Sequence, residues 1–505
     1  RPYTVQYRES DYNFIARLLE DEGIYWYFEH SAGQHQLVLV DSVTAHPPMS
    51  QAAGGLDSLP FYGNAGQVPP DTEYVGQWTF ARGVETGRTA LTSYDFERPS
   101  TSLLADRSLA RAHSLSSYEQ FDFLGDYTQR GDGAHLADVR LDEQQTRHEQ
   151  ITGNSNAHGL AVGHRFKLHR HPREDQNTEY LCVATSLQAR INGHEAGGAE
   201  GGGDLQCSFS ALPCTQQYRP PRRTPKPFVQ GPQTAQVVGP AGEEIFTDQY
   251  GRVKVQFHWD RYGQRNERSS CWVRTSSPWA GKSFGFVQVP RIGQEVPVDF
   301  LGGNPDRPQV VGTVDNGDNG YPYPLPAEKT RSGVLSRSSK GGAYGNANAL
   351  RFEDKKGEEQ LWLHAEKDQL IEVEHDEDHW VGNDRRKTID RDETNHIKRD
   401  RTETVDRNEK ITVHGWRTEE VDGDETITIH SNRKERVDHN ETISIGDNRA
   451  EDVGSNETIA IGQHRNETVG ANESVTIGKN QTFTVGSNRT KSVGANEKDS
   501  IGKNW

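Results

Sequence analysis

The sequence predicts a mainly β protein with a head of mixed strands and helices, a small barrel, and a C-terminal triple-stranded intertwined β-helix built by a homotrimer. Three observations support this fold class. An aliphatic residue recurs at every eighth position from Val381 to Ile501, short alternating strands fill residues 234–316, and a capped helix followed by a hairpin lies near the start. An interval of eight fits no helical period of about 3.6 residues.

The head is expected to span residues 1–219. Ser10 followed by an apolar pattern predicts an amphipathic helix that ends at Gly23. Residues 24–30 and 36–40 then predict a β-hairpin. The segment starts without Met, in what resembles the middle of a domain, so we expect further residues before it.

Mixed strands and helices are expected in the rest of the head. Residues 134–148 have a helical pattern, and residues 165–168 have that of a strand. The Pro-rich residues 220–233 then predict a stiff linker.

The barrel is expected over residues 234–316. The alternating pattern of one strand predicts that four side chains are buried: Val253, Val255, Phe257 and Trp259. The four between and after them are expected to face solvent: Lys254, Gln256, His258 and Asp260. The apolar pattern continues through Trp272, Val287, Val289, Val296, Val298, Phe300, Val310 and Val311. Five such runs suit a barrel of the OB type.

This segment carries nine Lys or Arg against nine Asp or Glu. A neutral barrel does not make a groove that tracks phosphates, which argues against nucleic acid as a partner. A second linker, rich in Gly, Pro and Ser, is expected over residues 317–345.

The octads of residues 346–505 carry too little apolar surface to fold alone. Burying one aliphatic side chain is worth about 1.5–3 kcal/mol, whereas ordering each backbone residue costs about 1–2 kcal/mol. Three chains wound about one axis improve this balance, because each aliphatic residue then meets two symmetry mates and the next octad of a neighbouring chain. The predicted trimer core is Val437, Ile445, Val453, Ile461, Val469, Ile477, Val485 and Val493.

A glycine follows each of these aliphatic residues from Ile445 onward. Glycine accepts positive φ or close backbone approach, so we expect it to form the corners of the shaft. The predicted corner residues are Gly446, Gly454, Gly462, Gly470, Gly478, Gly486 and Gly494. Asn residues two positions later can stack into amide ladders, a column that His464 interrupts.

A single-chain solenoid with about 24 residues per coil is the alternative architecture. Its core would be thin, and its sheets would keep free edges that an intertwined trimer lacks.

Composition narrows the function classes. The net charge is −17, which argues against nucleic acid and anionic membranes as primary partners. Spanning a bilayer needs about 20 consecutive apolar residues, and no run approaches that length, so we expect no stable membrane insertion. No signal peptide opens the sequence, so a cytoplasmic start is expected. The four cysteines, without a CxxC pair, are expected to be free thiols; a disulfide between Cys207 and Cys214 is an alternative.

Several motifs resemble the valine-glycine repeat (VgrG) family, the spikes of type VI secretion systems. The resemblance rests on residues 250–260 (YGRVKVQFHWD), 290–296 (PRIGQEV), 303–308 (GNPDRP) and 350–357 (LRFEDKKG), and extends over essentially the whole chain. It implies a head like that of contractile phage tail hubs, an OB barrel and a triple-stranded needle.

The resemblance also implies a place of action and partners. The spike would cap the inner-tube protein with its head, carry a PAAR-type tip protein and effectors at its needle, and leave the cytoplasm by secretion when the system fires. Ile501, Asn504 and Trp505 are the expected tip contacts, because a blunt trimeric end exposes unpaired strand groups and indoles.

Catalysis, cofactors and metals are not expected. His375 and His379 would lie about 13 Å apart on one face of a strand, too far for one ion. Asp248, His258 and Asp260 could form an acid/base set, but exposure on a barrel strand explains them better. A phage-tail-like spike or hub that hydrolyses glycans is the alternative function, and the regular spread of carboxylates argues against it. A surface adhesin is a third possibility, and the lack of a signal peptide argues against it.

Overall fold

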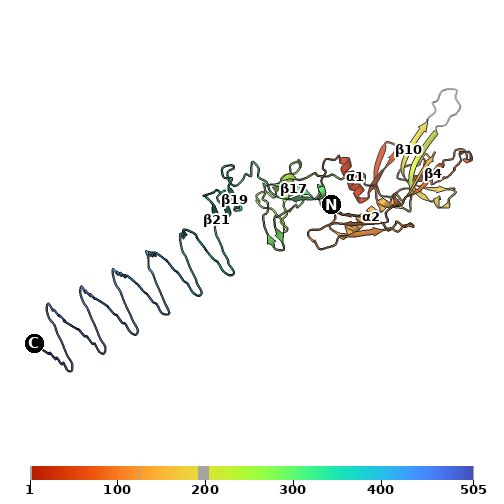
Figure 1. Cartoon of the computed structure of the whole chain (residues 1–505). Helices are drawn as coiled ribbons and strands as arrows, with labels where there is room; N and C mark the ends of the chain where they lie inside the picture. The colour runs from red at the N-terminus through yellow and green to blue at the C-terminus, as the bar shows by residue number, and fades with distance from the viewer. Residues whose placement is uncertain (1–2, 124, 191–203, 504–505) are drawn as a thin grey trace. The chain divides into compact units, whose positions relative to one another are not determined.

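The computed structural model describes residues 3–123, 125–190 and 204–503. The chain divides into two compact units, residues 1–378 and residues 379–505. Unit 1 holds all the helices and strands of the described residues, and unit 2 holds the octads. Figure 1 follows the chain from the N-terminus in red to the C-terminus in blue.

The first helix, α1 (Asp11–Glu22), begins and ends where the sequence predicts. The Ser10 hydroxyl accepts a hydrogen bond from the backbone N–H of Asn13, and Gly23 closes the helix with φ 73°. The predicted hairpin is also confirmed: β1 (Tyr25–Ser31) pairs antiparallel with β2 (Gln34–Val40).

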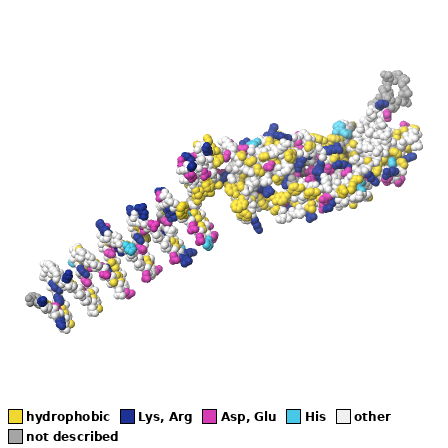
Figure 2. Space-filling model, viewed as in Figure 1, with side chains coloured by type: hydrophobic (Ala, Val, Ile, Leu, Met, Phe, Trp, Pro, Cys, Tyr) yellow, Lys and Arg dark blue, Asp and Glu magenta, His cyan; other side chains and the backbone are white. Residues whose placement is uncertain are grey.

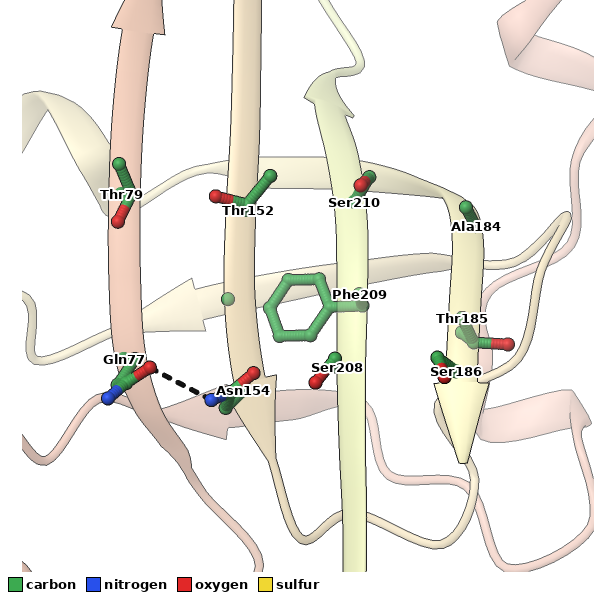
Figure 3. A pocket seen from close by; sticks show the side chains of 11 residues that line it. Gln77, Thr79, Thr152, Asn154, Ala184, Thr185, Ser186, Ser208, Phe209 and Ser210 are labelled. Atoms are coloured by element: carbon green, nitrogen blue, oxygen red, sulfur yellow. Dashed lines mark hydrogen bonds between the residues drawn. The ribbon is translucent and has the colours of Figure 1, made fainter. Parts of the chain in front are cut away.

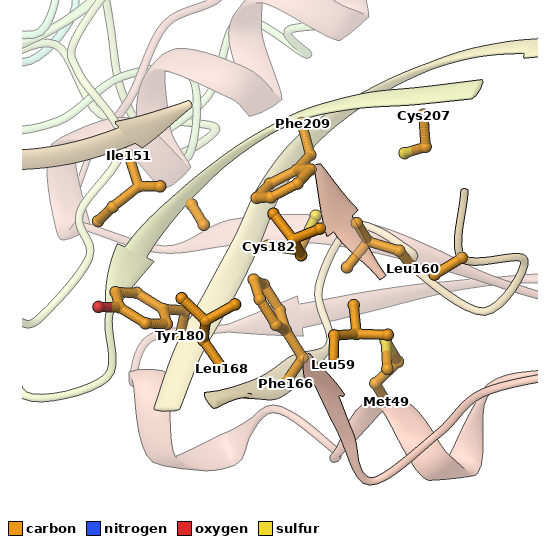
Figure 4. Packing of buried hydrophobic residues seen from close by; sticks show 13 residues of the cluster. Met49, Leu59, Ile151, Leu160, Phe166, Leu168, Tyr180, Cys182, Cys207 and Phe209 are labelled. Carbon is orange, nitrogen blue, oxygen red and sulfur yellow. The ribbon is translucent and has the colours of Figure 1, made fainter. Parts of the chain in front are cut away.

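A six-stranded sheet forms the larger layer of the head. Its strand order is β3 (Ser58–Pro60), β9 (Arg165–His169), β10 (Glu179–Arg190), β11 (Asp204–Pro213), β8 (Glu149–Ser155) and β4 (Val75–Arg82). Its main core gathers around Phe166, Tyr180 and Phe209, with Met49, Leu59 and Ile151 nearby (Figure 4). The sequence prediction of a strand over residues 165–168 is confirmed.

A three-stranded sheet makes the smaller layer, in the order β6 (Ala105–Ser108), β5 (Arg88–Thr92) and β7 (Glu119–Phe123). The second helix, α2 (Arg130–Gln145), packs against β5 and β6 and corresponds to the predicted helix over residues 134–148. Short 3₁₀ turns connect the elements of unit 1: Val43–Ala45, Met49–Gln51, Ala65–Gln67, Glu174–Gln176 and Leu301–Gly303.

The barrel segment contains a five-stranded sheet, but its strands are only partly those expected, because residues 287–289 form no strand and residues 233–238 do. The strand order is β13 (Lys254–Phe257), β12 (Gln233–Val238), β17 (Glu295–Phe300), β18 (Pro308–Val310) and β14 (Arg274–Thr275). A separate small hairpin joins β15 (Ala280–Gly281) to β16 (Phe284–Gly285). The barrel core contains Val237, Val253, Val255, Val296, Val298 and Val310, none of them measurably exposed.

The predicted alternation fails at the end of β13. Gln256, expected in water, is buried, because its side chain donates to the Asp260 carbonyl at 2.7 Å and accepts from the Arg265 amide. Trp259, expected in the core, lies beyond the strand and is 39% exposed. Its ring stacks on Phe257, and its indole N–H donates to the Gln233 side chain.

Two valines of the predicted apolar pattern are also outside the core. Val287 follows β16 and is 88% exposed, and Val311 follows β18 and is 45% exposed. Both stand after a strand has ended, where alternation no longer decides which side chain faces inward.

The segment expected as a second linker contains a strand. Within residues 317–345, β19 (Arg331–Leu335) pairs with β20 (Ala349–Glu353), which pairs with β21 (Gln360–His364). Glu353 anchors this small sheet by accepting from the Thr330 hydroxyl and the Arg331 guanidinium. These bonds hold the pKa of Glu353 below its ordinary value, the Thr330 bond contributing most.

Unit 2 is an open coil (Figure 1). Among its described residues there is no helix or strand, and bends recur at intervals of eight. In the described part of the whole chain, no helix is long and apolar enough to cross a membrane.

Substituting Gly23 tests how α1 is joined to the rest of the head. A Cβ at this position would lie 2.8 Å from Val139 Cγ1 and 2.9 Å from Arg219 Cδ, and its positive φ is unfavourable for alanine. We expect Gly23→Ala to lower the thermal midpoint of the head transition, at a cost of about 1–3 kcal/mol. Gly33→Ala is the matched control, since Gly33 has φ 75° but no atom within 4 Å of the added Cβ. Equal shifts of the thermal midpoint in the two variants would contradict a contribution from packing of Gly23 against Val139 and Arg219.

Candidate functional site

The aliphatic residues of the octads are half exposed in the single chain. The eight predicted core side chains, from Val437 to Val493, are 44–53% exposed. Figure 2 shows apolar side chains uncovered along the coil, between charged ones. A regular row of this kind needs another surface to cover it.

The backbone of the octads has the same deficit. Among the described residues of unit 2, no strand ladder and no backbone–backbone hydrogen bond is recorded. The turns of the coil therefore do not pair with one another. The solenoid alternative requires such pairing. Extended backbone that lacks partners within its chain is a template for pairing with further chains.

The octad glycines stand at the bends but not for the conformational reason expected. None of the predicted corner glycines has a positive φ. An added Cβ at any of them would meet no atom of this chain within 4 Å. Positive φ, one of the two reasons expected for glycine, is therefore wrong. The other, close backbone approach, stays a prediction.

Of the three predicted tip residues, one lies among the described residues. Ile501 is 52% exposed, at the end of the described coil. Asn504 and Trp505 lie outside the described residues.

The residues weighed for acid–base chemistry do not come together. Asp248 accepts from the Arg252 guanidinium at 2.6 Å, whereas Asp260 accepts from the backbone N–H groups of Tyr262 and Gly263. His258 is exposed, with Nε2 3.0 Å from the Thr234 hydroxyl. Each of the three side chains therefore has its own local role.

The metal-type residues of the sequence give no cluster either. Residues 375–379 form no strand, so the strand spacing assumed for His375 and His379 does not apply. In the described ranges, no three His, Cys, Asp or Glu side chains are grouped as metal ligands would be.

The four cysteines are free, including Cys207 and Cys214, the pair weighed as an alternative disulfide. Burial raises the pKa of Cys214 to about 12 and that of Cys271 to about 11. Such thiols are poor nucleophiles at neutral pH.

A shallow cavity of about 350 Å³ lies on one face of the six-stranded sheet (Figure 3). Hydroxyl and amide side chains line it, including Thr152 and Ser210, and Asn154 donates to Gln77 at 2.8 Å. No ionisable side chain lines it, so it offers hydrogen bonds rather than acid–base chemistry. The sequence prediction missed this surface, although Thr152 and Asn154 on β8, and Ser208 and Ser210 on β11, repeat at the strand period of two.

A carboxylate of the head joins the linker to the barrel. Asp126 Oδ2 accepts from Lys226 Nζ at 2.5 Å and from Asn304 Nδ2 at 3.3 Å. Its Oδ1 accepts from the Arg307 guanidinium at 3.3 Å. One side chain thus connects three segments that lie far apart in the sequence.

Three protein families match successive parts of the chain. Residues 1–193 match the phage tail baseplate hub family, and residues 245–314 match the type VI secretion system/phage-baseplate injector OB domain. Residues 332–445 and 432–505 match the C-terminal trimerisation domain of bacteriophage T4 gp5. The matches follow the order of head, barrel and octads.

Curated relatives carry spike names. The chain is 50% identical over 392 residues to the type VI secretion system spike protein VgrG1b of Pseudomonas aeruginosa, covering 77% of this chain and 52% of the relative. It is 36% identical to the actin cross-linking toxin VgrG1 of Vibrio cholerae, covering 77% of this chain and 35% of the toxin. The chain thus spans about half the length, or less, of these relatives.

Among solved structures, the chain is similar to the E. coli c3393 protein, described as a component of the type VI secretion system. The two share 19% identity with a TM-score of 0.38, covering 62% of each chain.

Removing the charge of Asp126 tests the contact between head and barrel. Asp126 has φ 57°, which Asn also tolerates, so Asp126→Asn keeps the backbone while removing an ion-pair partner. We expect faster proteolytic cleavage within residues 220–233 and a loss of about 0.5–1 kcal/mol in the stability of the barrel. Asp106→Asn is the control, because Asp106 pairs with Arg88 inside the head. Unchanged cleavage of the Asp126 variant would argue against this contact.

Proposed function

We propose a mechanical function for this chain, which belongs to the VgrG family of type VI secretion system spike proteins. Three copies form a rigid spike that caps the inner tube and is driven through a target envelope. The octads form its needle, and the head and barrel form its base.

The observation that supports this proposal best is the state of the octads in one chain. Their aliphatic side chains are half exposed, and their extended backbone has no ladder partner among the described residues. Three intertwined chains satisfy both deficits at once, because each strand pairs with strands of its neighbours on both sides. The match of residues 332–505 to a trimerisation domain supports the same number of chains.

The rigid needle has a physical basis in this arrangement. Axial load on the tip is shared among all the ladder hydrogen bonds of three chains. The polar and charged residues between the aliphatic positions keep the outer surface wet, so the shaft is not retained in lipid. We assign the core to the eight aliphatic residues from Val437 to Val493, and the corners to the glycines from Gly446 to Gly494.

The parts of the chain have separate tasks in this proposal. Residues 1–219 contact the inner-tube protein, and residues 346–505 carry effectors and a PAAR-type tip protein. The linker at 220–233 connects the head to the barrel of residues 234–316, and residues 317–345, which include β19, lie between the barrel and the needle in the chain. The spike is held in the cytoplasm before firing and then leaves through the secretion system.

The chain acts without catalysis in this proposal. The acid–base candidates have separate local partners, and the lining of the head cavity carries no ionisable group. The glycan-hydrolysing alternative needs a pair of carboxylates flanking a sugar, and no observation on this chain favours it.

A charged substitution in the core tests the proposal. Ile461→Asp places three carboxylates at one level of the axis, where burial of unpaired charge is unfavourable. We expect loss of the trimer in sedimentation and loss of contraction-dependent killing when this chain is the spike of the attacking bacterium. Asn466→Asp adds the same charge at a polar position of the same octad and is expected to leave both intact. Wild-type killing by the Ile461 variant would exclude this core.

A further inference from the structure

The octads contain a second repeat that is twice as long as the first. The fourth residue after each aliphatic residue defines a charge column along the shaft. From Arg385 to Glu473 this column alternates strictly between Arg and Glu. Its members are Arg385, Glu393, Arg401, Glu409, Arg417, Glu425, Arg433, Glu441, Arg449, Glu457, Arg465, Glu473, Gln481, Arg489 and Glu497.

Like charges are also avoided at neighbouring positions near the end of the charge column. Strict alternation would put Arg at position 481 and Glu at position 489, but the chain has Gln481 and then Arg489. The phase of the alternation reverses across a neutral residue. No two consecutive members of the column therefore carry the same charge.

The aliphatic repeat alone cannot align three chains. A chain shifted by one octad still presents an aliphatic residue at every level, so apolar burial changes little along the shaft. Repeats with a uniform pattern are prone to register slippage unless another feature specifies the register. The charge column has a period of sixteen and distinguishes the two alignments.

We propose that the charge column fixes the axial register of the three chains by ion pairs between chains. This inference rests on the trimeric needle proposed above, in which each octad lies beside the next octad of a neighbouring chain. Side chains at equal positions of neighbouring in-register strands share one sheet face, with strands about 4.8 Å apart. Each Arg of the column then lies between two Glu of neighbouring chains, and each Glu between two Arg.

A shift of one octad reverses this pattern. Between Arg385 and Glu473, Arg then neighbours Arg, and Glu neighbours Glu, on the levels of the shifted chain. Like charges directly opposite one another in a sheet are destabilising, and opposite charges are stabilising. The correct register is favoured by a sum over many levels, although each exposed ion pair is weak by itself.

The contacts within one chain leave several Glu of the column available for this role. Five Arg pair with the Glu two positions later, as in Arg417–Glu419 at 2.8 Å and Arg433–Glu435 at 3.0 Å. Each of these Arg side chains keeps 57–63% exposure. Of the seven Glu members, Glu393 pairs with Lys387 and Glu497 pairs with Lys491 within the chain. In the described residues, the other five form no ion pair within the chain: Glu409, Glu425, Glu441, Glu457 and Glu473.

A charge-reversal cycle in the full chain tests the inference. Variant A changes Arg417, Arg433 and Arg449 to Glu, and variant B changes Glu425, Glu441 and Glu457 to Arg. Each variant alone creates a run of like charges along the column. The combined variant restores alternation with reversed signs and leaves like charges only at the two ends of the block.

The register is read by a Val453→Cys substitution in each background, since in-register chains bring the three copies of position 453 together at the axis. We expect oxidation to give a covalent dimer in the otherwise wild-type chain and a several-fold lower yield in variants A and B. The combined variant should regain most of the yield. Salt should raise the thermal midpoint of the trimer in variants A and B and lower it in the wild type.

The combined variant separates contacts between chains from those within one chain. It contains Glu beside Glu419 and Glu435, so the pairs within one chain are as disrupted as in variant A. Recovery therefore supports pairing between chains. Full cross-linking in variants A and B, or no recovery in the combined variant, would overturn the register inference while leaving the trimer intact. A wild-type chain that neither cross-links nor forms trimers would overturn the proposed function itself.

Discussion

Among the described residues of unit 2, the octads have no backbone partners and no core within their own chain, and this is the constraint on which the rest of the structure depends. Unit 2 contains neither a ladder nor a core within its described residues. Unpaired backbone groups and uncovered aliphatic side chains are both unfavourable, and local rearrangement of a single octad removes neither. Association with further copies removes both, so folding and assembly of the needle are one process.

The head and barrel are stabilised differently. Each has its own buried core, around Phe166 and Tyr180 in the head and around Val237 and Val255 in the barrel. Such parts fold by burying apolar surface within one chain, as ordinary globular domains do. The Asp126 carboxylate connects the linker and the barrel to the head.

Much of this architecture could be predicted from the sequence, because the relevant signals are local. The cap at Ser10, the stop at Gly23 and the interval of eight each depend on residues close together in the chain. The failures occur where a strand ends or a distant segment intervenes. Trp259 leaves the core because β13 stops at Phe257, and Gln256 is buried because a following loop satisfies its amide.

The interactions that join distant segments could not be predicted from the sequence for the same reason. Nothing in the neighbourhood of Asp126 indicates that Lys226 and Arg307 will reach it. The octad glycines have no positive φ, so one of the two reasons expected for them is wrong, and close approach of another chain stays a prediction. The charge column, in contrast, is present in the sequence and gains meaning only when neighbouring octads belong to different chains.

The molar mass of the intact chain in solution is the most direct test of this account. Light scattering or sedimentation equilibrium at working concentration should give about three times the chain mass of 56.6 kDa. A compact, heat-resistant particle with the mass of one chain would contradict it, because a single chain would then have found internal partners for every octad.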